Sequence, residues 1–222
     1  MRKIAVCSFL TFIATGVLSA NTVFGVCGTG FTSGACSTQE ASGAVDGNWS
    51  LTSGAESITG TNAYVTQTGQ FPFPNWLANT STGEWVGPQV NGNESNNDAP
   101  GLYLYTETFN LTGYNLATVV LSGFFAADNS AEIFLNGVDT TIGTSSFSSL
   151  TAINLTSGFL QTTNTITIDV TNSSGTINNP SGLFVELGGT GTLGATTPEP
   201  ASFAFMGLGL AALGILGRRL RS

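Results

Sequence analysis

Short runs in which hydrophobic and polar residues alternate recur through the middle of the chain, from about residue 40 to residue 188. In the clearest run, Ile166, Ile168 and Val170 alternate with threonine and aspartate, the pattern of a strand with one buried face. Helical periodicity is nearly absent here. The runs predict strands at 49–52, 63–66, 102–111, 117–125, 131–135, 151–155, 165–170 and 183–187. About eight strands in this length predict one all-β domain, an antiparallel sandwich over residues 40–188.

Turn-forming residues separate these runs. Asn136-Gly137 follows the run at 131–135 directly and predicts a tight hairpin turn. Residues 71–100 contain four prolines and many Asn and Gly residues, and they predict a long loop region. The Gly-rich stretch 189–197 predicts a flexible linker after the domain.

The N-terminus has the pattern of a secretory signal peptide. Arg2 and Lys3 precede an uncharged run from Ile4 to Ala20, and small residues follow at once. We expect residues 1–25 to be this signal, cleaved after either Ala20 or Gly25. The alternative is a membrane anchor that stays uncleaved.

The C-terminus has the pattern of a single membrane span. Residues 201–217 carry no charge, and at 1.5 Å per residue a helix of this length reaches ~25 Å, near the short limit for crossing a bilayer. Arg218, Arg219 and Arg221 follow and predict a cytoplasmic end. A buried core helix is the alternative, against which the three arginines argue. With an exported start, this topology places the domain outside the cytoplasmic membrane.

Pro198-Glu199-Pro200 stands directly before the apolar run. A Pro-Glu-Pro triplet, a Gly/Ala/Leu-rich span and a terminal Arg cluster, in this order, resemble the PEP-CTERM sorting signal of Gram-negative bacteria. The resemblance covers residues 198–222. It implies that an exosortase-type membrane protease recognises and cuts the tail. The protein would then lie transiently in the inner membrane and finally at the cell surface or outside the cell.

The charge of the body excludes several functions. All five basic residues lie in the two terminal segments, and the chain contains no His. Twelve of the thirteen acidic residues lie between them, so the body has a net charge of about −12. Nucleic-acid binding, P-loop chemistry, histidine-dependent nucleophiles and zinc sites built on imidazole are therefore excluded. Neutral sugars and calcium remain possible ligands. A surface that is acidic merely for solubility is the alternative explanation.

Two cysteines remain after removal of a signal peptide. Cys27 and Cys36 are an even pair in an oxidising compartment, and we expect them to form a disulfide. This bridge would staple an otherwise loose N-terminal segment, residues 26–39.

Several motifs of the body resemble galactose-binding-like jelly-roll domains. They are Asp46-Gly47-Asn48-Trp49, Ala126-Ala127-Asp128-Asn129 followed by a strand ending in Asn136-Gly137, and the runs 163–172 and 181–187. The resemblance covers about 140 residues and implies a jelly-roll sandwich. Because this fold serves many roles, it does not identify a ligand.

Two groups of residues are candidates for ligand binding. Trp76 and Trp85 are expected to offer an aromatic platform to a sugar ring, with Asn and Asp side chains orienting the hydroxyls; alternatively, they fill the end of the sandwich. Asp128, Asn129 and Glu132 are candidate calcium ligands, as is the pair Asp46 and Glu186. A turn in which Asp128 and Asn129 bond their own backbone is the competing interpretation.

These features favour a non-catalytic, exported surface or matrix protein associated with exopolysaccharide or biofilm. Its expected partners are an exosortase-type protease, the membrane before processing, and a neutral polysaccharide, but no nucleic acid. A carbohydrate-binding lectin is the first alternative. A glycoside hydrolase is the second, although no carboxylate pair stands out in the sequence.

Overall fold

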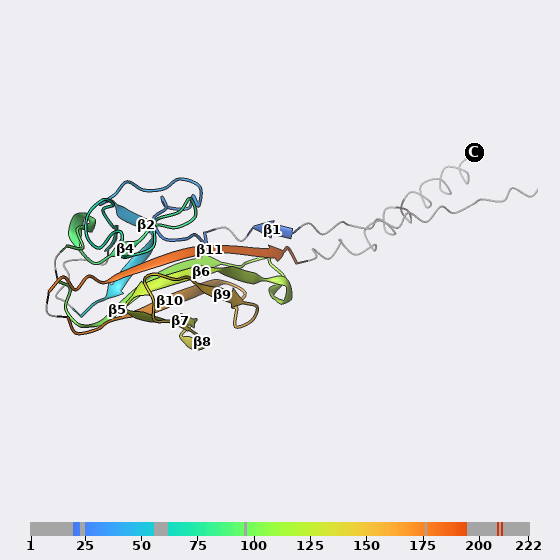
Figure 1. Cartoon of the computed structure of the whole chain (residues 1–222). Helices are drawn as coiled ribbons and strands as arrows, with labels where there is room; N and C mark the ends of the chain where they lie inside the picture. The colour runs from blue at the N-terminus through green and yellow to red at the C-terminus, as the bar shows by residue number, and fades with distance from the viewer. Residues whose placement is uncertain are drawn as a thin grey trace, which may run out of the picture.

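The computed structural model describes residues 20–22, 25–55, 62–95, 97–175 and 177–194, together with residues 208 and 210. Its described residues between 20 and 194 form β-strands joined by loops and two short 3₁₀ turns (Figure 1). The strands are β1 (Ala20–Thr22), β2 (Val45–Ser53), β3 (Asn62–Val65), β4 (Val86–Gly87), β5 (Gly101–Asn110), β6 (Val120–Asp128), β7 (Ser130–Leu135), β8 (Val138–Thr144), β9 (Thr151–Leu155), β10 (Thr163–Asn172) and β11 (Gly182–Thr192). The 3₁₀ turns are η1 (Val90–Gly92) and η2 (Leu116–Thr118).

The strands pair antiparallel in the order β8-β7-β10-β5-β2-β3-β4-β11-β6-β9, and β1 pairs with the end of β11. This array folds over on itself, because inward side chains of β5, β7 and β10 share one hydrophobic cluster with those of β6, β9 and β11. One half contains β5, β7, β8 and β10, and the other contains β6, β9 and β11. The chain passes to the second half between β5 and β6 and returns between β6 and β7. It crosses again between β8 and β9, between β9 and β10, and between β10 and β11. The fold is therefore an antiparallel β-sandwich wound as the predicted jelly roll.

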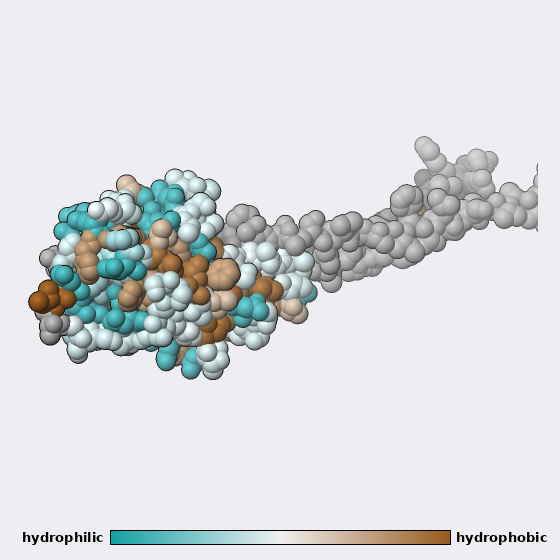
Figure 2. Space-filling model, in the orientation of Figure 1, coloured by the Kyte–Doolittle hydropathy of each residue, from teal (hydrophilic) through white to brown (hydrophobic). Residues whose placement is uncertain are grey.

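The core follows the alternation of the strands. On β5, Tyr103 and Tyr105 point inward and are fully buried, whereas Leu102 is exposed on the outer face. Ile166, Ile168 and Val170 of β10 are buried beside them, as the alternation predicts. Over the visible outer surface, hydrophobic residues are interspersed with hydrophilic ones (Figure 2).

All eight predicted strands are present, with ends displaced by up to five residues. The hairpin turn is confirmed, since Asn136 and Gly137 both have positive φ angles, of 54° and 77°. The predicted linker at 189–197 is wrong in its first part, because β11 continues to Thr192. Its Gly and Thr residues stay in the strand because β6 pairs with β11 as far as Thr190 and β1 pairs with residues 190–192. Strand β1 lies within the predicted signal peptide.

The N-terminal segment is not loose. The predicted disulfide between Cys27 and Cys36 is confirmed. Val26 and Phe31 are buried, and the Thr29 backbone N–H donates to Val185 O at 2.9 Å, beside β11. The segment is therefore part of the sandwich, held by hydrogen bonds and burial as well as by its disulfide.

Apart from β1 and Gly25, the predicted signal peptide lies outside the described residues, and so does the predicted span 201–217, apart from Leu208 and Leu210. Among the residues that are described, no helix has both the length and the apolar character required to traverse a bilayer.

Several carboxyl groups are buried without a basic side chain, because the sequence contains none between Lys3 and Arg218. Asp46 accepts backbone hydrogen bonds from Gly30 (2.6 Å), Asn48 (2.8 Å) and Trp49 (2.8 Å), yet burial outweighs these bonds and raises its pKa to about 6. Burial also raises the pKa of Glu84 to about 7 and that of Glu107 well above its usual value. Folding thus favours the protonated form of each of these acids.

We expect the protein to be more stable in mild acid than at neutral pH. An acid whose pKa is higher in the folded state contributes stability below its unfolded pKa, and this contribution is lost as the pH rises through the folded pKa. For Asp46 the full loss is on the order of 3 kcal/mol, most of it between about pH 4 and pH 6. Urea unfolding at pH 4.5, 6 and 7.5, in a buffer containing EDTA, measures this slope.

The variant Glu107→Gln tests whether buried carboxyl groups, rather than the net charge of the whole body, cause this pH dependence of stability. An amide keeps an acceptor for the Cys27 N–H, which now donates to Glu107 Oε1 at 2.9 Å, and it carries no charge to desolvate. At pH 7.5 this variant should be at least as stable as the wild type and show a shallower pH slope. Asp139→Asn, at an exposed position on β8, is the control and should leave the slope unchanged. Stability that rises from pH 4.5 to 7.5 contradicts the prediction.

Candidate functional site

A second hydrophobic cluster lies on the outer face of the half-sandwich formed by β6 and β11. Leu183 and Val185 of β11 point into the main core, whereas Phe184 points the other way. Trp76, Trp85 and Ala126 complete this second cluster. The loop between β3 and β4, which carries the two tryptophans, therefore covers β11 and β6 from outside.

Trp76 is fixed by contacts on several sides. Its ring centroid lies 4.2 Å from that of Trp85, and the ring of Phe73 meets it edge-on with centroids 6.1 Å apart. Its indole Nε1 donates to Asp128 Oδ2 at 2.8 Å. A Cβ added to Gly182 would overlap the ring, so glycine at this position lets the indole lie against β11.

The two tryptophans do not form the expected sugar platform. Trp85 is 0% exposed and Trp76 is 3% exposed. Trp85 is held between Trp76 and Phe184, and its Nε1 donates to Leu77 O at 2.9 Å. They do not fill the end of the sandwich either, because they cover the outer face of its second half. Sequence reasoning missed this third layer because it is built by a loop without periodicity.

Beside Trp76 the surface has a hollow of about 350 Å³, which we call the Trp76 pocket. Three of the four residues expected to bind a ligand line it together: Trp76, Asp128 and Asn129. The other lining residues are Phe71, Pro72, Asn75, Phe147, Asn178, Asn179 and Pro180. Half-buried aromatic rings and several amides thus surround one carboxyl group, an arrangement that suits a small polar ligand with apolar faces.

The side chains of the Asp128-Asn129 turn do not bond their own backbone, as one sequence-based interpretation expected. Asn129 Oδ1 accepts from the backbone N–H of Ser173 at 2.7 Å, so it binds a distant loop rather than its own backbone. Asp128 binds the indole of Trp76, and burial raises its pKa to about 6. The turn therefore joins the corner between β6 and β7 to the loops on either side of the Trp76 pocket.

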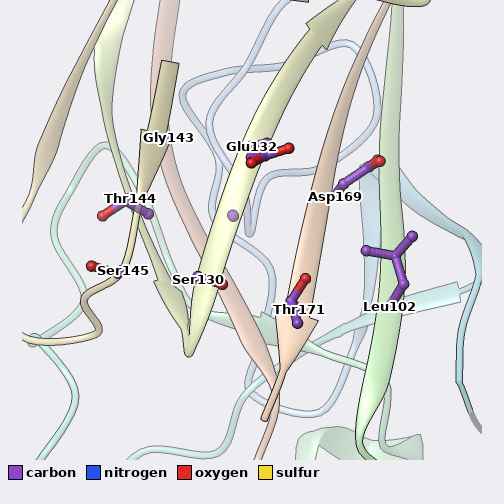
Figure 3. A pocket seen from close by; sticks show the side chains of 9 residues that line it. Leu102, Ser130, Glu132, Gly143, Thr144, Ser145, Asp169 and Thr171 are labelled. Carbon is purple, nitrogen blue, oxygen red and sulfur yellow. The ribbon is translucent and has the colours of Figure 1, made fainter. Parts of the chain in front are cut away.

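Glu132 lies in a different hollow, of about 480 Å³, on the outer face of β5, β7, β8 and β10 (Figure 3). Asp169 of β10 is its direct partner in the β7–β10 register. Burial, together with the nearby charge of Glu132, raises the pKa of Asp169. Alternation alone puts Asp169 on the outer face, but only the register between the two strands brings it to Glu132.

The other calcium candidates are engaged separately. All three hydrogen bonds accepted by Asp46 come from backbone N–H groups, and Glu186 accepts from the hydroxyls of Thr80 (2.5 Å) and Thr82 (2.9 Å). Within the described ranges, no three acidic or cysteine side chains come together in a way that would hold a metal.

The contact between Trp76 and β11 is testable with two glycines of the same strand. Gly182→Ala puts a methyl group where the indole lies, and overpacking of this kind costs about 1–3 kcal/mol. Gly188→Ala is the matched control, because a Cβ there meets nothing within 4 Å; its effect should stay within about 0.5 kcal/mol. Urea unfolding followed by tryptophan fluorescence measures both. Equal midpoints for Gly182→Ala and the wild type would show that Trp76 does not rest on this strand.

Comparison with known proteins adds two findings. No curated protein matches this sequence. Among solved structures, one match is a family 11 carbohydrate-binding module from Clostridium thermocellum in complex with a β-1,3-1,4-mixed-linked tetrasaccharide. It is 15% identical, the match covers 67% of this chain and 96% of that one, and the TM-score is 0.28.

The C-terminus matches a family model. Residues 196–221 match the PEP-CTERM protein-sorting motif, and the match contains the Pro-Glu-Pro triplet, the apolar run and the Arg cluster. Such a motif indicates an exported protein whose C-terminal signal is processed by an exosortase. The chain therefore joins an all-β sandwich domain to a C-terminal PEP-CTERM protein-sorting motif.

Proposed function

We propose that this protein is a non-catalytic component of the bacterial cell surface or extracellular matrix, delivered there by exosortase processing of its tail. The observation that carries the proposal is the match of residues 196–221 to the sorting motif. An acidic body without any basic residue agrees with a role among neutral exopolysaccharides, because it would repel anionic surfaces.

The tail has the physical properties that such processing requires. Prolines on both sides of Glu199 disfavour a helix and favour an extended triplet, the form in which proteases bind a substrate. The apolar run 201–217 is just long enough to span a bilayer, and the arginines beyond it favour the cytoplasmic side. If the run spans the membrane in this orientation, the cleavage motif lies at the outer membrane–water boundary.

The first test replaces the triplet by Pro198→Ala, Glu199→Ala and Pro200→Ala together. We expect the wild-type protein to lose its tail and reach the surface or medium, whereas the variant keeps residues 201–222 and accumulates in the inner membrane. Cell fractionation and mass spectrometry of the C-terminus measure both. Thr197→Ala, directly beside the triplet, is the control and should be processed normally. A triple variant that is trimmed and located like the wild type would overturn the proposal.

A second candidate function is binding of a neutral glycan in the Trp76 pocket. The observation that favours it is the convergence of half-buried Phe71 and Phe147 with Asp128 and several Asn side chains around about 350 Å³, a volume in the range of small-molecule sites. Apolar ring surfaces and amide groups match the faces and the hydroxyls of a sugar.

The glycan test uses residues at the rim of this pocket rather than the buried tryptophans, whose removal would damage the fold. Asn75 and Asn178 are exposed there. Replacing both by Ala should weaken binding to a neutral polysaccharide about tenfold or more, since each removes a hydrogen bond worth about 0.5–1.5 kcal/mol. Asn154→Ala, an exposed amide on β9, is the control. Pull-down with insoluble glucan and titration with soluble oligosaccharides measure the binding. If the rim variant binds as tightly as the wild type, this candidate function is wrong.

A further inference from the structure

A buried group of oxygen-bearing side chains lies where the loop before β5 meets the end of β10 and the start of β11. Glu94 is 0% exposed and Asp98 is 2% exposed, and both belong to the polar run Asn93-Glu94-Ser95-Asn96-Asn97-Asp98. Tyr105, Asn172 and Ser181 are buried with them. We call these five residues and Gln89 the Asp98 cluster.

Hydrogen bonds hold the two carboxyl groups in one network. Asp98 Oδ2 accepts from the Ser181 backbone N–H at 2.6 Å, and Asp98 Oδ1 accepts from the side-chain amide of Gln89. The backbone N–H of the same Gln89 donates to Glu94 Oε1 at 3.2 Å. Asn172 Nδ2 donates to Asp98 O at 3.2 Å, which ties β10 to the loop. One glutamine therefore links both acids, and Asp98 links the loop to β10 and to Ser181, directly before β11.

Three neutral oxygen atoms of this cluster are buried without a hydrogen-bond partner among the described residues: Tyr105 Oη, Asn172 Oδ1 and Ser181 Oγ. They belong to the same place, because Asn172 and Ser181 both contact Asp98. Burial raises the pKa of Tyr105, and the nearby charges of Glu94 and Asp98 raise it further. Native interiors leave few such atoms unsatisfied, so these three call for a binding partner.

The charge of the cluster leaves few ways to compensate it. Buried carboxylates are normally paired with basic side chains or bound to metals, and this sequence has no basic residue between Lys3 and Arg218. The available ligands are carboxylate, amide and hydroxyl oxygens. Calcium accepts six to eight such oxygens in flexible arrangements, whereas magnesium demands a stricter octahedron and zinc prefers nitrogen and sulfur.

We propose that the Asp98 cluster is a calcium site. Glu94 and Asp98 would supply the charged ligands, and Asn172 Oδ1 and Ser181 Oγ the neutral ones. A bound calcium ion would tie the loop before β5 to the ends of β10 and β11. With only two acids, the site is not visible as an acidic cluster, and it shares no residue with the calcium candidates expected from the sequence. It is independent of the proposed sorting and glycan functions.

The experiment uses the full chain, purified in a mild detergent at pH 7.5. Calcium at 100-fold its Kd should raise the midpoint of thermal unfolding by about 5 °C or more relative to EGTA, and magnesium should raise it less. Isothermal titration should give a Kd near that of extracellular calcium modules, about 10⁻⁴–10⁻³ M. Equal midpoints in calcium and EGTA, with no binding heat, would overturn the proposal.

Variants then assign the site. Glu94→Gln with Asp98→Asn should abolish both the thermal shift and the binding. The matched control, Glu132→Gln with Asp169→Asn, removes the paired acids of the other pocket and should change neither. If the double variant does not fold, the single variant Glu94→Gln tests the site, because it leaves each hydrogen bond of Asp98 described above in place. It should weaken calcium binding about tenfold or more. Unchanged affinity in a folded Glu94 variant, or loss of binding in the Glu132 control, rules out this location.

Discussion

The burial of carboxyl groups in a chain without internal basic residues is the constraint on which the architecture depends. Each buried acid has to be stabilised by N–H donors, by a proton or by a metal ion, because no Lys, Arg or His lies between the terminal segments. Asp46 shows the first solution, since its oxygens accept from three backbone N–H groups of the N-terminal segment and β2. Glu107 likewise accepts from the backbone N–H of Cys27. Acids placed in this way attach loops to the sandwich where other proteins use ion pairs.

Strand β11 is where the layers of the domain meet. Its inner side chains enter the main core, its outer side carries Phe184 under the two tryptophans, and Thr29 of the N-terminal segment bonds Val185. The loop before β4 can cover this strand because Gly182 leaves room for an indole. The Trp76 pocket forms at the edge of this cover, so the candidate ligand site and the stability of the third layer depend on the same contacts.

The two parts of the chain support one picture of the protein from different directions. The sorting motif indicates export and processing at the membrane, and the body contains a disulfide, a bond that forms and persists in oxidising compartments outside the cytoplasm. Its polar features, namely the Trp76 pocket, the pocket between Glu132 and Asp169, and the Asp98 cluster, all use oxygen and amide groups. This chemistry suits sugars and hard cations.

Local patterns in the sequence were enough to identify the strands, the Asn136-Gly137 turn, the disulfide and the sorting motif, because each depends on neighbouring residues or on a short motif. Alternation also showed which residues share a face, and on β10 it showed which face is buried. On β5 both faces are apolar, and only the structure shows that the tyrosines are inside and Leu102 is outside. The burial of Trp76 and Trp85, the extension of β11 to Thr192, the pairing of Glu132 with Asp169 and the gathering of the Asp98 cluster were decided only by the tertiary structure. They join segments far apart in the chain through loop packing and strand register, and a local pattern contains no information about either.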